Sequence, residues 1–289
     1  MTDERLLTAV FKTLWPDVED LNCQEPGHAP GHTCLSVSGG VDLGDLVEEL
    51  SARYGEPLAG TDRLPPLPFS GRVDWTFAWP FSNRWVAFGR TGRGTGGVPA
   101  LVIAPRSTPD AEQLPPGLSW LERLVAVTGW EPRTVGRIDW PAVESSLGTP
   151  LPSDYKKLVE TFGKGLFSDF HQVFMPDDLI RRTQWGARHG QASWEPYPPF
   201  PAPGGLVPWM GNEHEQSFSW ITEGPDPDRW PVYATEAEPV AGQRFACTAT
   251  EFLFRSLTDP LHPIGLPVDL RAHWFHDTDR SVHAGRRRG

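Results

Sequence analysis

Four residues with metal-binding side chains lie in one short stretch of the chain: Cys23, His28, His32 and Cys34. Two cysteines and two histidines are a permitted ligand set for Zn²⁺, so the stretch could hold a structural metal clip. The spacing matches no familiar zinc finger, and the close succession of His32 and Cys34 makes one tetrahedral site awkward. We therefore interpret the four as coincidental loop residues and predict no metal and no cofactor, with the metal clip as the alternative.

A second chemical pattern, Gly92-x-Gly94-x-x-Gly97, formally matches the dinucleotide-binding fingerprint. That fingerprint needs a helix after the glycines, because the N-terminus of the helix holds the pyrophosphate. Residues 98–104 look like a strand instead. We therefore expect a hairpin loop at this position and no nucleotide site.

Other catalytic signatures are missing from the sequence. It contains no Walker A lysine motif, no G-x-S-x-G elbow and no H-E-x-x-H zinc motif. No sequence signal pairs its serines, histidines and aspartates into a triad, although triads are recognised by geometry. We predict no catalytic residues and no enzymatic activity; an enzyme that uses the first half of the chain is the alternative.

Composition limits the remaining classes of function. The 289 residues include 13 Trp and 15 Phe, which argues against general disorder, and the three Cys do not make a disulfide framework. The formal net charge of −11 would repel a phosphate backbone and would favour a basic protein partner. Residues 1–10 show no signal peptide, and no apolar run approaches the ~20 residues that span a bilayer. We expect a cytoplasmic protein that binds neither nucleic acid nor membrane.

The first 108 residues predict a domain with two helices and an antiparallel sheet. Apolar side chains recur at helical spacing over residues 4–14 and 43–54. The sequence pattern predicts strands in four further segments, at residues 34–38, 73–79, 84–90 and 98–104. We assign residues 1–108 to an uncharacterised α+β domain.

The rest of the chain predicts a linker, a second domain and a tail. Residues 109–117 are rich in Pro and polar side chains, as in a linker, and residues 118–129 favour a helix. Residues 184–205 are aromatic and Pro-rich, and we interpret them as a long loop. We assign residues 118–276 to a second domain and 277–289 to a disordered basic tail. The expected class is therefore α+β, with two domains that each combine a mostly antiparallel sheet with flanking helices.

Residues 138–165 predict two short helices joined by a turn. Trp140, Val143 and Leu147 fall at helical spacing, and Gly148 can end that helix. A second helix follows near Pro152, and its apolar stripe consists of Tyr155, Leu158, Val159 and Phe162. We expect Asp139, Trp140, Asp154 and Tyr155 to be framework residues and not catalytic groups.

The order of these residues resembles the start of the SUKH superfamily, bacterial relatives of a fungal cell-wall synthesis regulator. Trp140, Leu151-Pro152 and Asp154-Tyr155 match the family pattern, whereas Phe162-Gly163 stands where Asn-Gly is commoner. Segments resembling the family's strands and closing helix follow in order, at residues 206–212, 217–221, 229–233 and 250–257. The resemblance covers roughly residues 118–260 and implies a SUKH-like second domain.

The resemblance implies a protein-binding function. SUKH-like domains in bacteria are typically immunity proteins, which neutralise a toxin domain by binding it, and a regulatory scaffold is the alternative. We expect a basic toxin domain as partner, and leave the oligomeric state open. The candidate contact residues lie in aromatic or acidic segments predicted as loops and turns: Trp185, Trp194, Trp209, Asn212, Glu213, His214, Glu215, Asp226 and Asp228.

Overall fold

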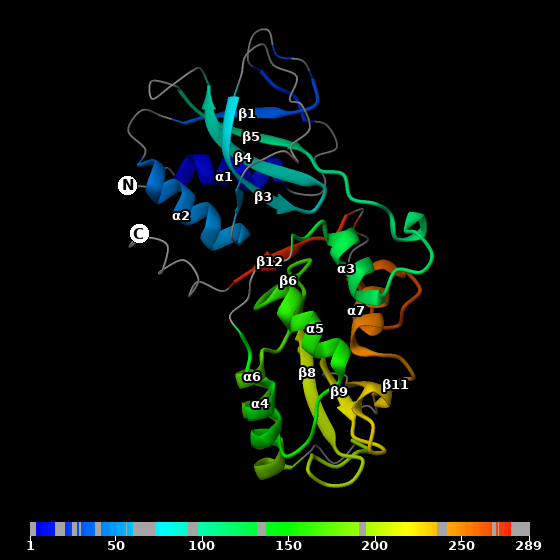
Figure 1. The fold of residues 1–289 in the computed structure, drawn as a ribbon. Coiled ribbons are helices and arrows are strands. Elements are labelled where there is room, and N and C mark those ends of the chain that lie inside the picture. The colour runs from blue at the N-terminus through cyan, green and yellow to red at the C-terminus, as the bar shows by residue number, and fades with distance from the viewer. Residues whose placement is uncertain are drawn as a thin grey trace. The chain divides into compact units, whose positions relative to one another are not determined.

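The structure is a computed structural model, and helices and antiparallel sheets make up its fold (Figure 1). The mixed α+β class is therefore confirmed. The residues described are 4–14, 21–24, 28, 30–37, 42–55, 57–59, 73–91, 98–131, 137–190, 195–235, 242–267, 270 and 272–278. Within this part of the chain no helix is both long enough and apolar enough to cross a membrane.

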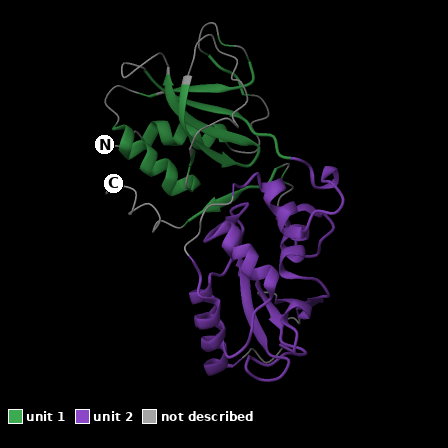
Figure 2. Cartoon of the chain, in the orientation of Figure 1, with its two compact units in different colours: residues 1–108, 270–278 green, residues 109–269, 279–289 purple. Residues whose placement is uncertain are grey.

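Backbone proximity divides the chain into two compact units, coloured separately in Figure 2. Unit 1 comprises Met1–Thr108 and Leu270–Thr278, and unit 2 comprises Pro109–Asp269 and Asp279–Gly289. The boundary between Thr108 and Pro109 thus coincides with the end of the predicted first domain. Residues 109–117, predicted as a linker, belong to unit 2 and contain a short 3-10 helix, Ala111–Gln113. Residues 270–276 were predicted to belong to the second domain, but they lie in unit 1.

The returning segment belongs to unit 1 because a buried arginine binds it there. The Arg106 guanidinium donates hydrogen bonds to the carbonyl oxygens of Ser82, at 3.0 Å, and His273, at 2.9 Å. Trp274 packs its ring on Phe81 with 5.0 Å between centroids. Arg106 and His273 are far apart in the sequence, so no local sequence pattern indicates their contact. Most of the predicted tail, from residue 279 on, lies outside the described residues.

Unit 1 is built on a five-stranded antiparallel sheet with the order β1-β5-β4-β3-β2. Its helices are α1 (Glu4–Leu14) and α2 (Leu43–Tyr54). Its strands are β1 (Thr33–Ser36), β2 (Leu58–Ala59), β3 (Val73–Phe81), β4 (Arg84–Thr91) and β5 (Val98–Pro105), and the short strand β12 (Phe275–Asp277) lies in the returning segment. Both predicted helices and the four predicted strand regions are present, within a few residues at their ends.

One face of this sheet packs against α1 and α2 and forms the core of unit 1. Leu46 and Leu50 recur at helical spacing on α2 and are fully buried. The side chain of Asp42 caps the start of this helix by accepting from the backbone N–H groups of Gly44 and Asp45. Each large apolar side chain removed from water contributes roughly 1.5–3 kcal/mol. The buried cluster includes Leu6, Leu7, Val10, Leu14, Trp79, Val86, Phe88, Leu101 and Ile103.

Unit 2 contains a second antiparallel sheet, in which the order is β11-β10-β9-β8-β7-β6. Its strands are β6 (Gly165–Phe167), β7 (His171–Val173), β8 (Leu206–Asn212), β9 (Ser217–Ile221), β10 (Val232–Thr235) and β11 (Gln243–Phe245). Its helices are α3 (Trp120–Thr128), α4 (Trp140–Leu147), α5 (Ser153–Phe162), α6 (Pro176–His189) and α7 (Ala249–Thr258), with a 3-10 turn at Pro227–Arg229.

Aromatic side chains fill the face of this sheet that α5 and α7 cover. Trp209 on β8 stacks on Trp220 of β9 at 5.6 Å, and both indoles are buried. Tyr155 of α5 meets Trp220 edge-on at 5.1 Å, and Phe252 of α7 meets Trp209 edge-on at 6.3 Å. The Tyr155 hydroxyl donates to the carbonyl of Phe174 at 2.6 Å. The apolar stripe predicted for the second helix, α5, therefore faces the core.

One carboxylate joins the two covering helices. Asp154, in the first turn of α5, accepts from both the backbone N–H of Thr250, at 2.8 Å, and its hydroxyl, at 3.0 Å. Its other oxygen accepts from the N–H of Tyr155 at 2.8 Å. Because helix N-termini present N–H groups without partners inside the helix, this carboxylate stabilises the start of α5 and of α7 together.

Replacing Asp154 therefore tests how unit 2 is held together. Asp154→Ala removes three hydrogen bonds to a charged group and should lower the free energy of unfolding by about 2 kcal/mol. Urea denaturation measures the loss, and hydrogen exchange should show that α5 and α7 lose protection together.

Asp177→Ala is the matched control, because Asp177 is also an aspartate in the first turn of a helix but is exposed. It should cost well under 1 kcal/mol. Equal losses in the two variants would contradict the assignment of the bridge to Asp154.

A neutral histidine is buried in the same core. Burial, with a smaller contribution from nearby His262, lowers the pKa of His171, on β7, to about 3. Neither ring nitrogen of His171 has a hydrogen-bond partner among the described residues. An unfolded chain takes up this proton near pH 6.5. The stabilisation is therefore complete at neutral pH and is lost as pH falls from about 6.5 towards 3.

His171→Leu should remove this pH dependence while keeping the site filled. Between pH 7 and pH 5, wild-type protein should lose about 2 kcal/mol more unfolding free energy than the variant does. Urea titrations at the two pH values measure the difference. The control is the same substitution at the exposed His214. If the unfolding free energy of the wild type changes with pH no more than that of His171→Leu, the assignment is contradicted.

Candidate functional sites

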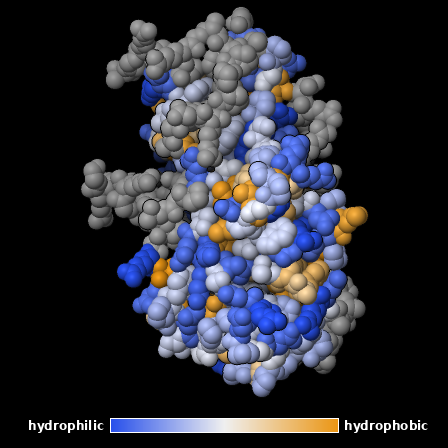
Figure 3. Space-filling model, turned by 45° about the vertical axis from the view of Figure 1, so that its right-hand side comes forward, coloured by the Kyte–Doolittle hydropathy of each residue, from blue (hydrophilic) through white to orange (hydrophobic). Residues whose placement is uncertain are grey.

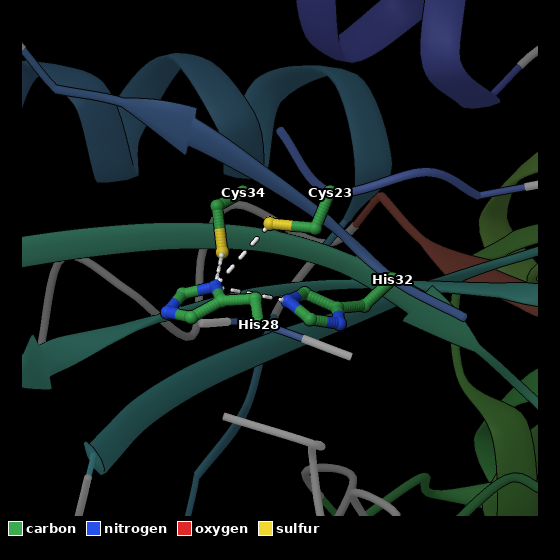
Figure 4. A group of neighbouring side chains, drawn as sticks. All are labelled: Cys23, His28, His32 and Cys34. Carbon is green, nitrogen blue, oxygen red and sulfur yellow. Dashed lines mark hydrogen bonds between the residues drawn. The ribbon is translucent and has the colours of Figure 1, made fainter. Parts of the chain in front are cut away.

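The four cysteine and histidine residues singled out in the sequence converge in unit 1 (Figure 4). Nδ1 of His28 lies 3.3 Å from the sulfur of Cys23, 3.4 Å from the sulfur of Cys34 and 3.4 Å from Nε2 of His32. All four potential ligand atoms lie within 4.8 Å of one another. Grouping of this kind is what a single metal ion requires.

Strand geometry explains the convergence. His32 directly precedes β1 and Cys34 lies within it, so residues two apart point to the same face. Leu35, the residue directly after Cys34, packs against the helix-covered core. Cys34 and His32 therefore face the opposite side of the sheet. The close succession of His32 and Cys34, taken in the sequence as an obstacle to one site, is what aligns them. That the four residues hold no metal stays a prediction.

The environment of the cluster suits ligands. His32 is fully buried, and the other three residues are half-buried. Burial lowers the pKa of His32, and the neighbouring charge of His28 lowers it further, which favours the neutral imidazole. Leu21 lies just before the cluster and is buried, and its carbonyl accepts from the N–H of Gly31 at 3.1 Å. Both ends of the stretch are thus fixed to unit 1.

Unit 2 contains a hollow of about 550 Å³ on the face of its sheet opposite α5 and α7. Ser217 and Ser219 of β9 and Thr235 of β10 contribute small polar side chains to its floor. Helix α6 supplies the wall, with Arg181, Arg182, Thr183, Trp185 and Gly186. This volume lies in the range of binding pockets. The sequence did not indicate the hollow, because it depends on small side chains from two strands meeting a distant helix.

An exposed tryptophan stands on the wall of the hollow. The Trp185 side chain is 59% exposed, and His189, one turn later on α6, stacks on it at 4.6 Å. Residues 184–205 were predicted to be a long loop, and this is wrong for residues 184–189, which end a regular helix. Pro176 at the helix start, with acids in the first turn and bases in the last, is the capping signal that identifies α6.

Trp209, the second predicted contact residue, cannot touch a partner in the folded state. It is completely buried between Trp220 and Phe252, so its assignment to an interface is corrected. A β-bulge between Pro208 and Met210 breaks the alternation of β8 at this residue. Trp194, the third predicted aromatic contact, lies outside the described residues.

The predicted polar contacts fall at opposite ends of strand β9. Glu213, His214 and Glu215 are exposed in the turn that enters β9 at Ser217, which lines the hollow. Asn212 shapes that turn, since its side-chain oxygen accepts from the N–H groups of His214 and Gln216, both at 3.1 Å. Asp226 and Asp228 follow the other end of β9, a strand that is itself about 13 Å long at ~3.3 Å per residue.

The aspartates of this second turn have structural partners. Asp228 accepts from the backbone N–H of Ser153 at the start of α5, and Asp226 accepts from the N–H of Asp228 at 3.1 Å. Both side chains are exposed, but their oxygens are engaged in shaping the turn and the helix start. The structure thus places Trp185 on the wall of the hollow and Ser217, which follows the Glu213–Glu215 turn, on its floor. Neither that turn nor Asp226 and Asp228 are among the residues that line the hollow.

Two further candidates for chemistry are resolved by their surroundings. The Gly92–Gly97 pattern lies outside the described residues, but the segment after it is the strand β5, as predicted, and not a helix. Burial, with a smaller contribution from the carboxylate of Glu251, raises the pKa of the Cys247 thiol to about 12. A thiol so reluctant to ionise is a poor nucleophile at neutral pH.

The chain matches no protein-family model, no curated protein and no solved structure. The assignment of function therefore depends on the residues and geometry described above.

Proposed function

We propose that the protein binds another protein through unit 2 and acts without catalysis, as an immunity protein that occludes a toxin domain in the cytoplasm. The single observation that carries the proposal is the exposed Trp185 beside the hollow between α6 and the sheet. Tryptophan is enriched at the energetic centres of protein interfaces, where a pocket and an aromatic anchor act together. The resemblance of residues 118–260 to the SUKH superfamily supports the choice of partner class.

The Trp185 side chain is already held in place on its helix, so ordering it at an interface costs little conformational entropy. The indole stacks on His189, and the backbone carbonyl of Trp185 lies 2.9 Å from Nδ1 of that histidine. A side chain already held on a helix loses little conformational freedom when a partner covers it. On the face drawn in Figure 3, hydrophobic residues form small separate patches among hydrophilic ones. An interface of this type gains affinity from a few buried aromatics and not from a broad apolar surface.

Charge supports a basic partner. The exposed Glu213 and Glu215 lie in the turn that leads to Ser217 on the floor of the hollow, and the whole chain carries a net charge of −11. The cations of the wall have their own partners, because Arg181 pairs with Asp178 and Arg182 lies 4.1 Å from the ring centre of Phe174. The acidic turn can therefore steer a basic surface towards the hollow.

The anchor is tested by substitution at Trp185. The full chain captures its partner from a lysate of its native host, and the purified partner is titrated by calorimetry. Trp185→Ala should weaken binding about 30-fold or more, and Trp185→Phe should weaken it less. Leu261→Ala, at a hydrophobic side chain that is 89% exposed elsewhere in unit 2, should change binding no more than about threefold.

Two outcomes contradict the proposal at different levels. Wild-type affinity for Trp185→Ala would exclude the hollow as the interface. A captured partner without toxic activity, or one whose activity is unchanged at saturation, would exclude the immunity role while leaving protein binding in place.

Steering by the acidic turn is tested by association rates. Glu213→Gln should slow association several-fold at low ionic strength, and the difference from wild type should shrink as salt is added. Stopped-flow mixing with the captured partner measures the rates. Glu112→Gln changes the same charge at an exposed position in the first turn of the 3-10 helix of unit 2, and should leave the rate unchanged. Salt-independent association of the wild type would contradict the role of charge.

A further inference from the structure

We infer that Cys23, His28, His32 and Cys34 form a structural zinc site that fixes the edge strand of unit 1. The inference is independent of the protein-binding proposal, because the cluster and the hollow belong to different units. It begins from the donor atoms, two sulfurs and two imidazole nitrogens grouped within 4.8 Å. Tetrahedral sets of two thiolates and two imidazoles are typical of Zn²⁺.

The distances fit a tetrahedron around one ion. With Zn–S near 2.3 Å and Zn–N near 2.0–2.1 Å, neighbouring ligand atoms lie about 3.3 to 3.8 Å apart. Nδ1 of His28 is 3.3 and 3.4 Å from the two sulfurs and 3.4 Å from Nε2 of His32. His28 is thus already at the edge length of such a tetrahedron from all three other ligands. The remaining pairs, within 4.8 Å, need only small side-chain rotations to close.

The charges balance as well. Two thiolates and two neutral imidazoles around one divalent cation have no net charge. Such a centre can be half-buried, as these residues are, without leaving an uncompensated charge inside unit 1. Because four protein ligands complete the coordination, no position remains for water or substrate. The site is therefore structural, and it gives the protein no hydrolytic centre.

The position of the site indicates what it stabilises. β1 lies at one edge of the five-stranded sheet, and among the described strands it pairs only with β5, Cys34 lying opposite Val102. Of the stretch that precedes β1, residues 21–24, 28 and 30–32 are described, and among them Leu21 and His32 are buried. One ion would tie residue 23 to residue 34 and so hold Cys23 and His28 against β1. Metal loss should therefore loosen β1 and leave unit 2 intact.

The test uses metal content and cobalt spectroscopy on the full chain. Protein purified in reducing buffer without chelator should contain one zinc per chain by mass spectrometry. After removal of zinc, Co²⁺ should bind with equal stoichiometry and give thiolate-to-cobalt charge-transfer bands and the intense d–d bands of tetrahedral coordination. Hydrogen exchange of β1 should speed up at least tenfold in the metal-free protein, whereas α5 and β8 should be unchanged.

Variants separate loss of a ligand from loss of the fold. His28→Ala should abolish stoichiometric binding, and His28→Cys should restore it, since three cysteines and one histidine are also a permitted set. Cys247→Ser removes the cysteine outside the cluster and should bind like wild type. The inference is overturned if reduced wild-type protein neither holds zinc nor takes up Co²⁺, or if Cys23 and Cys34 are joined by a disulfide in protein purified without reductant. If a folded His28→Cys protein does not bind the metal, His28 is not a ligand of the site.

Discussion

The carboxylate of Asp154 holds together the two helices on which unit 2 is organised. It accepts hydrogen bonds at the start of α5 and at the start of α7, so the helices begin at a common point above the sheet. Their apolar faces then meet one face of the sheet, where Trp209 and Trp220 stack. The opposite face is left to α6 and to small polar side chains, and the hollow results. The framework thus determines where the hollow lies, although neither Asp154 nor the two stacked tryptophans line it.

The two units differ in the side chains that stabilise their sheets. Unit 2 fills one sheet face with interlocking aromatic rings, and a buried tyrosine hydroxyl finds a backbone partner at Phe174. Unit 1 has a continuous apolar core beneath α1 and α2, but the stretch before β1 contributes only Leu21 to that core among its described residues. Where apolar burial is this sparse, metal coordination is a physical substitute, because a few strong ligand bonds replace many weak contacts.

Local signals in the sequence predicted the elements that depend on local physics. The apolar spacing of Leu46 and Leu50 and the stripe of Tyr155, Leu158 and Phe162 predicted α2 and α5 correctly. Helix α6 was missed because little of it is apolar and buried, although its Pro and acidic start gave a usable signal. The three-residue strands β6 and β7 were missed because only their pairing defines them.

The candidate sites were less predictable because they depend on distant residues. The packing of Trp209 between Trp220 and Phe252 and the approach of α6 to β9 leave no local pattern. The cluster of Cys23, His28, His32 and Cys34 is intermediate: the strand predicted from residue 34, extended back by two residues, would have aligned His32 with Cys34. What the sequence lacked was the return of residues 23 and 28 to that strand, which is a property of the folded loop.

The central claim is that unit 2 binds a protein partner at the hollow beside Trp185. Hydrogen exchange of the full chain, with and without its captured partner, tests this most directly because it reports every segment at once. The account predicts slower exchange in α6 and in the turn and strand from 212 to 219, with α1, α2 and β4 unchanged. Protection confined to unit 1, or to the Asp226–Asp228 turn, would contradict it.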